Sequence, residues 1–349
     1  MIVFTCGGTG GHISPAITVA DALDAPYTFI GGDRLEKTML TDHPFIEIAS
    51  SRQNVLLMLK GFFQSLSYLL RHRPKAVFST GGYVTFPVCI AAAVLFIPIV
   101  LLEQNSIPGK TNRFIAFFAK QIFTAYPIKK FHPQKTLLAG NPVPVIPKSP
   151  DRNKYNWIIM GGSQGAKAMN TLILSSLAAL QDLELNITWL TGTTHYQTLC
   201  ESMKMFAVNE KPPFENATVY QSGKHHIVLC PFHHDIPSLM PKMGLSISRA
   251  GAMSIAELIA AEIPTLYIPY PFAAENHQLY NAAYVQRLGG GLTMAESEWS
   301  PSVFAERIHS LLNNYEHYQE GLWKMNRQRA LDVIISELHR QGLCDAHYQ

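Results

Sequence analysis

The sequence predicts an α/β protein with two Rossmann-like domains, each containing a doubly wound parallel sheet, that face a shared cleft. Two glycine-rich turns, half a chain apart, follow short apolar runs: residues 7–11 follow 2–6, and residues 161–165 follow 157–160. A glycine turn between a strand and a helix lets backbone N–H groups approach an anion, because no side chain blocks them. Apolar runs also alternate with helical segments along both halves, which is typical of a parallel sheet. These observations together predict two nucleotide-fold domains.

Length and composition limit the kinds of protein that this sequence can encode. At 349 residues the chain has room for two domains of ~150 residues each. Hydrophobic residues make up 47% and charged residues 15%, which indicates a globular protein and excludes a disordered one. The five cysteines are scattered without a Cys-x-x-Cys pair, which predicts a reducing compartment and neither a disulfide framework nor a zinc site. The chain opens on an apolar strand without a basic leader, so a cytoplasmic location is expected.

The charge is distributed unevenly. Residues 1–150 carry 14 Lys or Arg against 7 Asp or Glu, a balance of +7, and the remainder carries 14 against 18, a balance of −4. A basic half fits an anionic surface, such as a phospholipid membrane or a nucleic acid. The alternative is a drift of surface charge without function.

The first half alternates strands and helices. A strand is expected over 2–6, and Ser14 is expected to cap a helix with Pro15 at its first position, running to about Leu23. The next predicted elements are strand 27–30, helix 55–71, strand 76–80, helix 86–96, strand 99–102 and helix 110–119. Pro87 and Pro98 divide the apolar run 86–102 into pieces shorter than the ~20 residues that a membrane span needs.

A linker is expected where prolines cluster between residues 141 and 150, followed by the polar segment 151–156. The alternating pattern then restarts. Its predicted elements are strand 157–160, helix 166–180, strands 187–190, 227–230 and 245–248, helix 254–261, strand 265–268 and a helical tail from Ser302.

The first glycine turn and its neighbours are candidates for chemistry. The turn lacks the third glycine of a dinucleotide fingerprint, because Ile13 stands at that position. His12 begins the following helix and is a candidate general base, since an imidazole has an ordinary pKa of ~6.5. The alternative is that His12 only holds the loop through a hydrogen bond. The polar segment 103–105 follows a predicted strand at the sheet edge where such folds bind ligands, and Asn112 lies one helical turn further on.

In the second half, residues 248–254 follow a strand and open a helix that carries Glu257. Their small side chains let a diphosphate approach the helix N-terminus, and Glu257 can accept hydrogen bonds from ribose hydroxyls. Arg249 either adds a charge for the diphosphate or forms a structural ion pair. The adjacent histidine pairs 225–226 and 233–234 do not predict a metal site, because neighbouring side chains on a strand point to opposite faces.

These motifs resemble, in order and spacing, the MurG family of bacterial peptidoglycan glycosyltransferases. The resemblance runs from about residue 2 to about residue 291. The segments that carry it are Gly7–Ala16, Gly81–Val84, Glu103–Asn105, Thr111–Asn112, Gly140–Val143, Gly161–Ala166, Arg249–Ala252, and Gln278 with Asn281.

The resemblance implies a glycosyltransferase-B fold and one reaction. N-acetylglucosamine passes, with inversion, from UDP to the C4 hydroxyl of undecaprenyl-diphospho-N-acetylmuramoyl-pentapeptide, which converts lipid I to lipid II. No cofactor is expected, and no residues are assigned to a metal. Residues 1–148 are then the acceptor and membrane-facing domain, 151–324 the UDP-sugar domain, and a last helix over about 325–349 packs back on the first. The implied partners are UDP-N-acetylglucosamine, the polyprenyl-diphosphate acceptor, an anionic membrane surface, and cell-wall or division-complex proteins, but no nucleic acid. The implied location is peripheral, on the cytoplasmic face of the plasma membrane.

The resemblance also assigns site residues. On the donor side, Glu257 binds ribose and Gln278 meets the sugar. The other implied donor residues are Ser163, His233, Arg249, Ala252, Met253 and Ser254. The N-terminal domain is expected to contribute Thr9, Gly10, Gly11, Asn105 and Asn112. His12 is the first candidate for the base, followed by Tyr83 and Glu103.

Two positions depart from the family pattern. Pro144 replaces an arginine, so a cationic donor contact is missing or comes from elsewhere, with Lys148 and Arg249 as candidates. Leu102 replaces a histidine, which leaves His12 as the base. The apolar helix 55–71 is flanked by basic residues and is expected either to lie on anionic lipid or to be a core helix with a charged end. The basic residues are Lys60, Arg71, Arg73 and Lys75.

Other functions compete with this interpretation. A different UDP-sugar-dependent glycosyltransferase of the same fold, acting on a lipid or natural product, shares the motifs. A UDP-sugar epimerase or a non-catalytic nucleotide-binding module fits the two glycine turns alone. Neither of these accounts for Thr9–His12 together with Glu103–Asn105.

Overall fold

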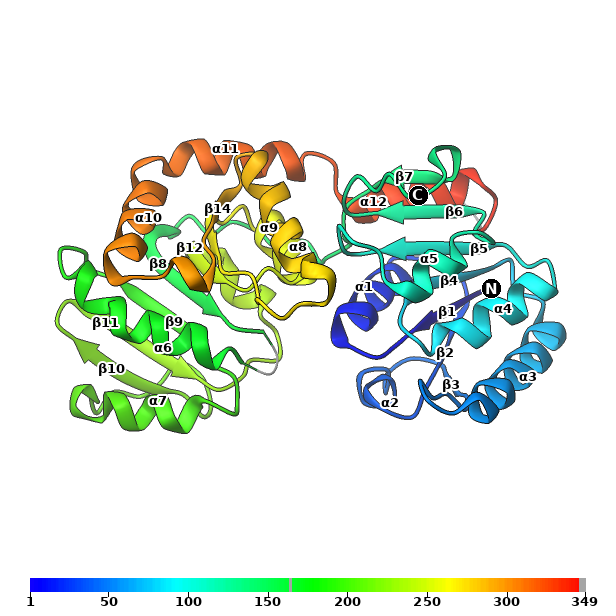
Figure 1. Cartoon of the computed structure of the whole chain (residues 1–349), viewed down its shortest axis with the longest axis horizontal. Helices are drawn as coiled ribbons and strands as arrows, with labels where there is room; N and C mark the ends of the chain where they lie inside the picture. Colours follow the sequence, from blue (N-terminus) through cyan, green and yellow to red (C-terminus); the bar gives the residue numbers. More distant parts are fainter. Residues whose placement is uncertain (163–164, 345–349) are drawn as a thin grey trace. The chain divides into compact units, whose positions relative to one another are not determined.

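The computed structural model describes residues 1–162 and 165–344, and it separates into two compact units. Unit 1 contains Met1–Val143 and the chain from Gln328 onward, and unit 2 contains Pro144–Arg327. Each unit has one sheet with helices on both faces (Figure 1).

The sheet of unit 1 has seven strands in the order β3-β2-β1-β4-β5-β6-β7, and every neighbouring pair is parallel. This confirms the predicted doubly wound parallel sheet. The strands are β1 (Ile2–Cys6), β2 (Tyr27–Gly31), β3 (Phe45–Glu47), β4 (Ala76–Gly81), β5 (Ile99–Glu103), β6 (Gln121–Thr124) and β7 (Thr136–Leu138).

The two faces of this sheet bury two hydrophobic clusters. Alternate side chains of a strand point to opposite faces. Ile2 and Phe4 of β1 therefore join the cluster under α1 and α12, whereas Val3 joins the cluster with residues of α3, α4 and α5. The helices are α1 (Gly10–Asp21), α2 (Leu35–Met39), α3 (Val55–His72), α4 (Thr85–Val94), α5 (Lys110–Ile115) and α12 (Ala330–Arg340).

Helix α1 begins at Gly10, so the prediction of a start at Ser14 is wrong by one turn. The glycine turn passes directly into the helix, with Thr9 in the extended conformation before it. Pro15 therefore lies inside the helix rather than at its first position. Because proline has no N–H, it cannot donate the usual backbone hydrogen bond there. This arrangement places Gly10, Gly11 and His12 in the first turn.

The sheet of unit 2 also has seven strands, in the order β10-β11-β9-β8-β12-β13-β14. All neighbouring pairs are parallel except β10 and β11, because the chain reverses through Gly223 at a φ of +59° and forms a hairpin. The strands are β8 (Asn153–Met160), β9 (Asn186–Leu190), β10 (Thr218–Ser222), β11 (His225–Cys230), β12 (Met243–Ser248), β13 (Thr265–Tyr267) and β14 (Gly291–Thr293). The polar segment expected to be a linker thus already contains the start of β8.

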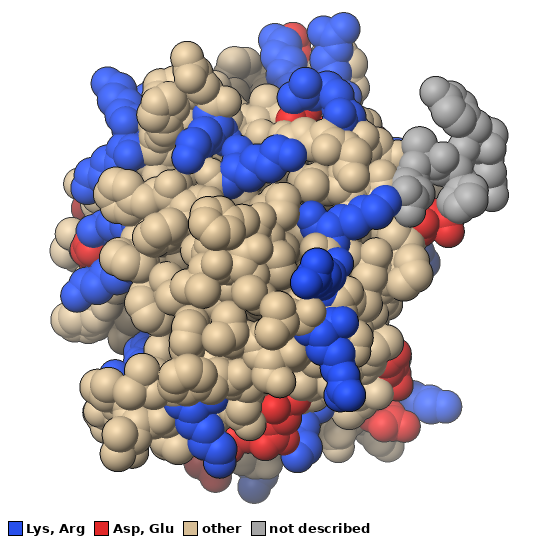
Figure 2. All heavy atoms as spheres, turned by 90° about the vertical axis from the view of Figure 1, so that its right-hand side faces the viewer, with Lys and Arg blue, Asp and Glu red and all other residues tan. Residues whose placement is uncertain are grey.

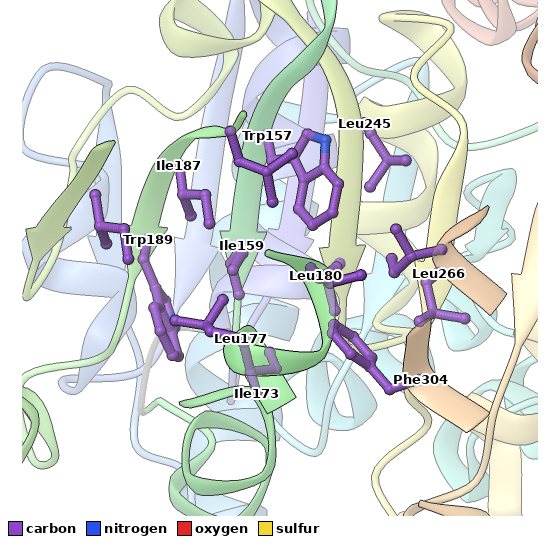
Figure 3. Packing of buried hydrophobic residues seen from close by; sticks show 14 of the residues in the cluster. Trp157, Ile159, Ile173, Leu177, Leu180, Ile187, Trp189, Leu245, Leu266 and Phe304 are labelled. Atoms are coloured by element: carbon purple, nitrogen blue, oxygen red, sulfur yellow. The ribbon is translucent and has the colours of Figure 1, made fainter. Parts of the chain in front are cut away.

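The core of unit 2 lies between this sheet and its helices. Trp157 and Trp189, on neighbouring strands, pack with Ile173 of α6 and Phe304 of α10 (Figure 3). The indole of Trp189 donates to Asn170 over 3.0 Å, so its polar atom is satisfied inside the core. The helices are α6 (Lys167–Ser176), α7 (Tyr196–Met203), α8 (Ala252–Ala260), α9 (His277–Arg287), α10 (Pro301–Asn313) and α11 (Tyr315–Asn326).

The long apolar run of unit 1 is divided as expected, into α4 and β5. Within residues 1–162 and 165–344, no helix combines the length and the apolar character required to cross a membrane.

Candidate active site

The predicted residues of unit 1 converge at the carboxyl ends of three neighbouring strands, β1, β4 and β5. The turn after β1 packs backbone to backbone against the turn after β4: Gly7 N–H donates to Gly81 O over 3.2 Å. A Cβ on Gly82, whose φ is +97°, would lie 2.0 Å from Gly7 O. Only glycine permits this approach, so the two turns form one backbone-lined surface.

His12 is held by the turn of β4. Its Nδ1 lies 2.9 Å from Thr80 O, and Thr80 Oγ1 donates back to His12 O over 2.6 Å. Gln104 Nε2 donates to the same Thr80 carbonyl over 2.8 Å. A carbonyl oxygen only accepts, so Nδ1 carries the proton and Nε2 keeps its lone pair. The hydrogen bond that holds the loop is therefore also the bond that leaves the other ring nitrogen able to accept a proton.

The surroundings keep His12 neutral. Burial lowers the pKa of His12 below its usual value. The hydrogen bonds with the Thr80 backbone and the Gln104 side chain act in the opposite direction, and the positive charge of Arg52 adds to the lowering. A neutral imidazole with a free lone pair is the form that a general base requires.

Glu103 is buried and saturated by donors. Its carboxylate accepts from the backbone N–H of Asn105 over 2.9 Å, from that of Gly109 over 3.1 Å and from Asn112 Nδ2 over 2.8 Å. Burial raises the pKa of Glu103, and these hydrogen bonds oppose the rise. The carboxylate thus holds the segment after β5 and orients Asn112, which lies against Gly81.

One residue that sequence reasoning missed supports the first glycine turn. Gly8 N–H donates to Glu36 Oε1 over 2.7 Å, and Glu36 is only 1% exposed. A Cβ on Gly7 would lie 2.1 Å from that oxygen. In the sequence, Glu36 is only an acidic residue in a short segment after β2. Nothing there distinguishes it from an exposed side chain. The N–H groups of Gly10 and Gly11, in the first turn of α1, have no intrahelical acceptor and form its positive end.

The second glycine turn follows β8. Gly162 and Gly165 have φ values of +88° and +80°, and Gly165 N–H donates to Gly162 O over 2.9 Å. A Cβ on Gly165 would lie 2.7 Å from Thr191 O, so Gly165 packs closely on the chain after β9. The predicted residue Ser163 lies outside the described residues.

The segment after β12 leads into α8, as the sequence predicts. Ala252, Met253 and Ser254 form its first turn, and Glu257 lies on the next. Burial raises the pKa of Glu257 to about 7. Within the described chain no group donates a hydrogen bond to this carboxyl. A half-buried carboxyl without a donor is suited to accept hydrogen bonds from ribose hydroxyls.

Arg249 forms the structural ion pair that was one of its two predicted roles. Its guanidinium donates to Ile268 O over 3.1 Å, to Pro269 O over 3.3 Å and to Glu296 Oε1 over 2.5 Å. It also lies 5.5 Å from the ring centroid of Tyr270. The side chain therefore fixes the loop after β13.

Other predicted donor residues lie on the same loop or beside it. Gln278 Oε1 accepts from Tyr270 N–H over 3.0 Å, so Gln278 and Arg249 hold neighbouring parts of the loop. Asn281 is buried and donates to Ala250 O over 3.3 Å. The backbone N–H of Asp235 donates to Nδ1 of His233 over 3.2 Å, after β11. Lys148 pairs with Glu262, so its charge is also already compensated.

The adjacent histidines of β11 lie on opposite faces of the strand. Of the first histidine pair, His225 is buried and His226 reaches outward to Glu210, as opposite faces of a strand require. In residues 1–162 and 165–344, no three His, Cys, Asp or Glu side chains gather as a set that could hold a metal ion.

Comparisons with known proteins agree on one family. Residues 2–124 match the glycosyltransferase family 28 N-terminal domain, and residues 157–335 match the family 28 C-terminal domain. A protein of Bacillus pumilus named UDP-N-acetylglucosamine–N-acetylmuramyl-(pentapeptide) pyrophosphoryl-undecaprenol N-acetylglucosamine transferase is 32% identical, over 90% of this chain and 91% of its own. A protein of the same name from Caldicellulosiruptor saccharolyticus is also 32% identical, over 95% of both chains.

Solved structures show the same fold. The crystal structure of MurG from Acinetobacter baumannii has a TM-score of 0.76 at 24% identity and covers 97% of this chain and 98% of its own. The calicheamicin glycosyltransferase CalG4 has a TM-score of 0.66 at 13% identity, with coverage of 97% and 98%. The two domain matches and the curated relatives, which span nearly the whole chain, show that this chain belongs to glycosyltransferase family 28 and, within it, to the MurG family.

Proposed function

We propose that this protein transfers N-acetylglucosamine from UDP-N-acetylglucosamine to the C4 hydroxyl of N-acetylmuramoyl-pentapeptide carried on undecaprenyl diphosphate, with inversion. The observation that carries the proposal is the neutral tautomer of His12, fixed by Thr80 and placed beside the first glycine turn. The names of the curated relatives supply the donor and the acceptor.

The proposed chemistry is a single displacement. The Nε2 lone pair of His12 accepts the proton of the acceptor hydroxyl while its oxygen attacks the anomeric carbon of the donor sugar. The new C–O bond forms as the bond from that carbon to the UDP oxygen breaks, and UDP leaves with the electron pair. Attack from the face opposite the leaving group accounts for inversion.

The two units divide recognition in this proposal. Unit 1 binds the acceptor at its glycine turns, where Thr9, Gly10, Gly11, Asn105 and Asn112 line or support the edge of the sheet. Unit 2 binds the donor around α8: Glu257 accepts from the ribose hydroxyls, and the N-terminus of the helix faces the diphosphate. Ser163, His233 and Gln278 complete the proposed donor contacts. Arg249 contributes by holding the loop after β13 in place.

Peripheral binding to the cytoplasmic face of an anionic membrane is part of the proposal. Helix α3 buries Gly61, Ser65 and Leu69 against unit 1 and leaves other apolar side chains exposed, with Leu56 at 76% and Phe63 at 62%. On the face of unit 1 in Figure 2, Lys and Arg side chains border a broad uncharged area. Exposed apolar residues beside cations favour contact with acyl chains and anionic headgroups.

The transfer assay uses radiolabelled UDP-N-acetylglucosamine and a lipid I analogue, with product identified by mass. The proposal expects one labelled disaccharide lipid and one UDP per turnover. A diacylglycerol or a natural-product aglycone in place of the analogue tests the rival glycosyltransferases. Product formed only with those acceptors, or donor binding without any UDP release, would contradict the proposal.

A further inference from the structure

Arg52 is a charged side chain of unit 1 to which the transfer chemistry gives no role. It lies between β3 and α3, and its guanidinium carbon is 5.3 Å from the ring centroid of Tyr83. Tyr83 in turn borders the first glycine turn, since a Cβ on Gly8 would lie 3.8 Å from its ring. Arg52, Tyr83 and the turn before α1 therefore form one cluster in unit 1.

The segment that carries Arg52 is held at both sides. Ala49 N–H donates to Gln64 of α3 over 2.8 Å, and a Cβ on Gly61 would lie 2.0 Å from Ala49 O. After Arg52, the N–H groups of Gln53 and Asn54 both donate to Ser51 Oγ, over 3.2 and 3.1 Å. The position of the arginine is thus set by a folded segment rather than by a free loop.

The charge of Arg52 is uncompensated. The side chain is exposed, and within the described residues no carboxylate forms an ion pair with it. Arg249 offers a contrast, since its guanidinium is occupied by two carbonyls and Glu296. A guanidinium held over an aromatic face by a cation–π contact still has N–H groups that can bind a phosphate.

We propose that Arg52, oriented by Tyr83, binds a phosphate of the acceptor's diphosphate at the first glycine turn. The assignment rests on the proposed function, which places the acceptor in unit 1. The N–H groups of Gly10 and Gly11, at the positive end of α1, supply the neutral donors of the same anion site. Arg52 supplies the planar pair of charged donors that a phosphate accepts.

A consequence for the base follows. Arg52 also lowers the pKa of His12. A bound phosphate compensates the arginine, which strengthens His12 as a base once the acceptor is in place.

Steady-state kinetics of Arg52→Gln test the assignment. A charged hydrogen bond to phosphate contributes about 1.5–3 kcal/mol, so the acceptor KM is expected to rise roughly 10- to 100-fold. The donor KM should stay within about twofold, and Arg52→Lys should recover part of the loss. Lys120→Gln is the matched control, because Lys120 is an exposed cation just before β6, at the amino ends of the strands of the same sheet. An unchanged acceptor KM in Arg52→Gln, or an equal rise for donor and acceptor, would overturn the assignment.

Two further measurements test the role of Arg52 separately from the proposed transfer reaction. The acidic limb of the kcat/KM profile should move to higher pH in Arg52→Gln, because the loss of a nearby positive charge raises the pKa of His12. If the wild-type protein shows no transfer, binding of a short polyprenyl diphosphate in the presence of saturating UDP still tests Arg52. A tenfold weaker affinity in Arg52→Gln supports the assignment, and equal affinity refutes it.

Discussion

Glu257 gives the sharpest prediction for the donor site, because its carboxyl is half-buried and has no donor in the described chain. A carboxyl pKa that moves from 4.5 in the unfolded chain to about 7 in the folded one costs roughly 3 kcal/mol of ionisation free energy. The folded state holds this proton after the unfolded state has lost it. The free energy of unfolding therefore falls as pH rises from about 4.5 to about 7, and it levels off above that range.

Glu257→Gln removes this titration, so the difference in stability between the wild type and this variant reports the carboxyl of Glu257 alone. Chemical denaturation from pH 4 to 8 should show the stability of the wild type falling by roughly 3 kcal/mol relative to Glu257→Gln. The affinity for the donor should depend on the ionisation of the same carboxyl. In the proposed donor site, ribose hydroxyls donate to the ionised carboxylate, so the wild-type affinity for UDP-N-acetylglucosamine should rise roughly 30-fold from pH 5.5 to 8. The diphosphate of this donor is a diester and does not titrate in this range.

Calorimetric donor binding to both proteins at each pH is the measurement. The affinity of Glu257→Gln should stay flat with pH and should match or exceed that of the wild type only at the acidic end. A wild-type affinity that is also flat, or a constant difference in stability between the two proteins, would refute the reasoning.

The remaining predictions address the first glycine turn, the ion pair and the membrane face. Gly82→Ala should lose at least about 1–2 kcal/mol and melt several degrees lower, because its φ of +97° and its contact with Gly7 O exclude a side chain. Gly109→Ala, where a Cβ meets nothing within 4 Å, should melt like the wild type, and equal melting of both variants would contradict the argument. Arg249→Met should destabilise unit 2 by about 3–5 kcal/mol, and Glu296→Gln should do the same, since each leaves a partner unpaired. A fully stable Arg249→Met protein with weakened donor binding would instead favour a direct role. Replacing four cations near α3 with Glu should weaken flotation with anionic vesicles more than tenfold, at about 1 kcal/mol per cation, and unchanged flotation would contradict the membrane proposal. Those four are Lys60, Arg71, Arg73 and Lys75, and the matched control in unit 2 is Lys204, Lys211, Lys224 and Lys242.

The parallel sheets were predictable because apolar runs and glycine turns are local signals. Strands β1, β4 and β5 are continuous buried runs, and each is followed by glycine or polar residues at the edge that carries the site. Short edge strands such as β7 gave no such signal, because three residues that are partly exposed form no period. The hairpin of β10 and β11 was missed for a related reason. Its turn, Gly223 with Lys224, is short, and only Val219 and Tyr220 of the five residues in β10 are buried.

Site residues could be predicted from the sequence where their chemistry follows from the residue type. They could not be predicted where it depends on a contact with a residue that is distant in the sequence. His12 was found because an imidazole has an ordinary pKa near neutrality and this one follows a glycine turn at the start of a helix. The tautomer of His12 could not be predicted, because it depends on a hydrogen bond to Thr80, which is 68 residues away in the sequence. The same limit applies to Glu36 and Arg52, because their partners at Gly8 and Tyr83 are brought to them only by the fold. Arg249 shows the converse case: its sequence context allowed two roles, and the position of Glu296 indicates the structural one.

The proposed reaction depends most on His12 as the proton acceptor. Single-turnover transfer to the lipid acceptor, measured for His12→Ala beside the donor dissociation constant of the same protein, tests it most directly. Loss of a general base should slow transfer roughly 10²- to 10⁴-fold while donor affinity stays within about twofold, because the proposed donor contacts lie in unit 2. A rate less than tenfold below that of the wild type would contradict the account and assign the proton to another group.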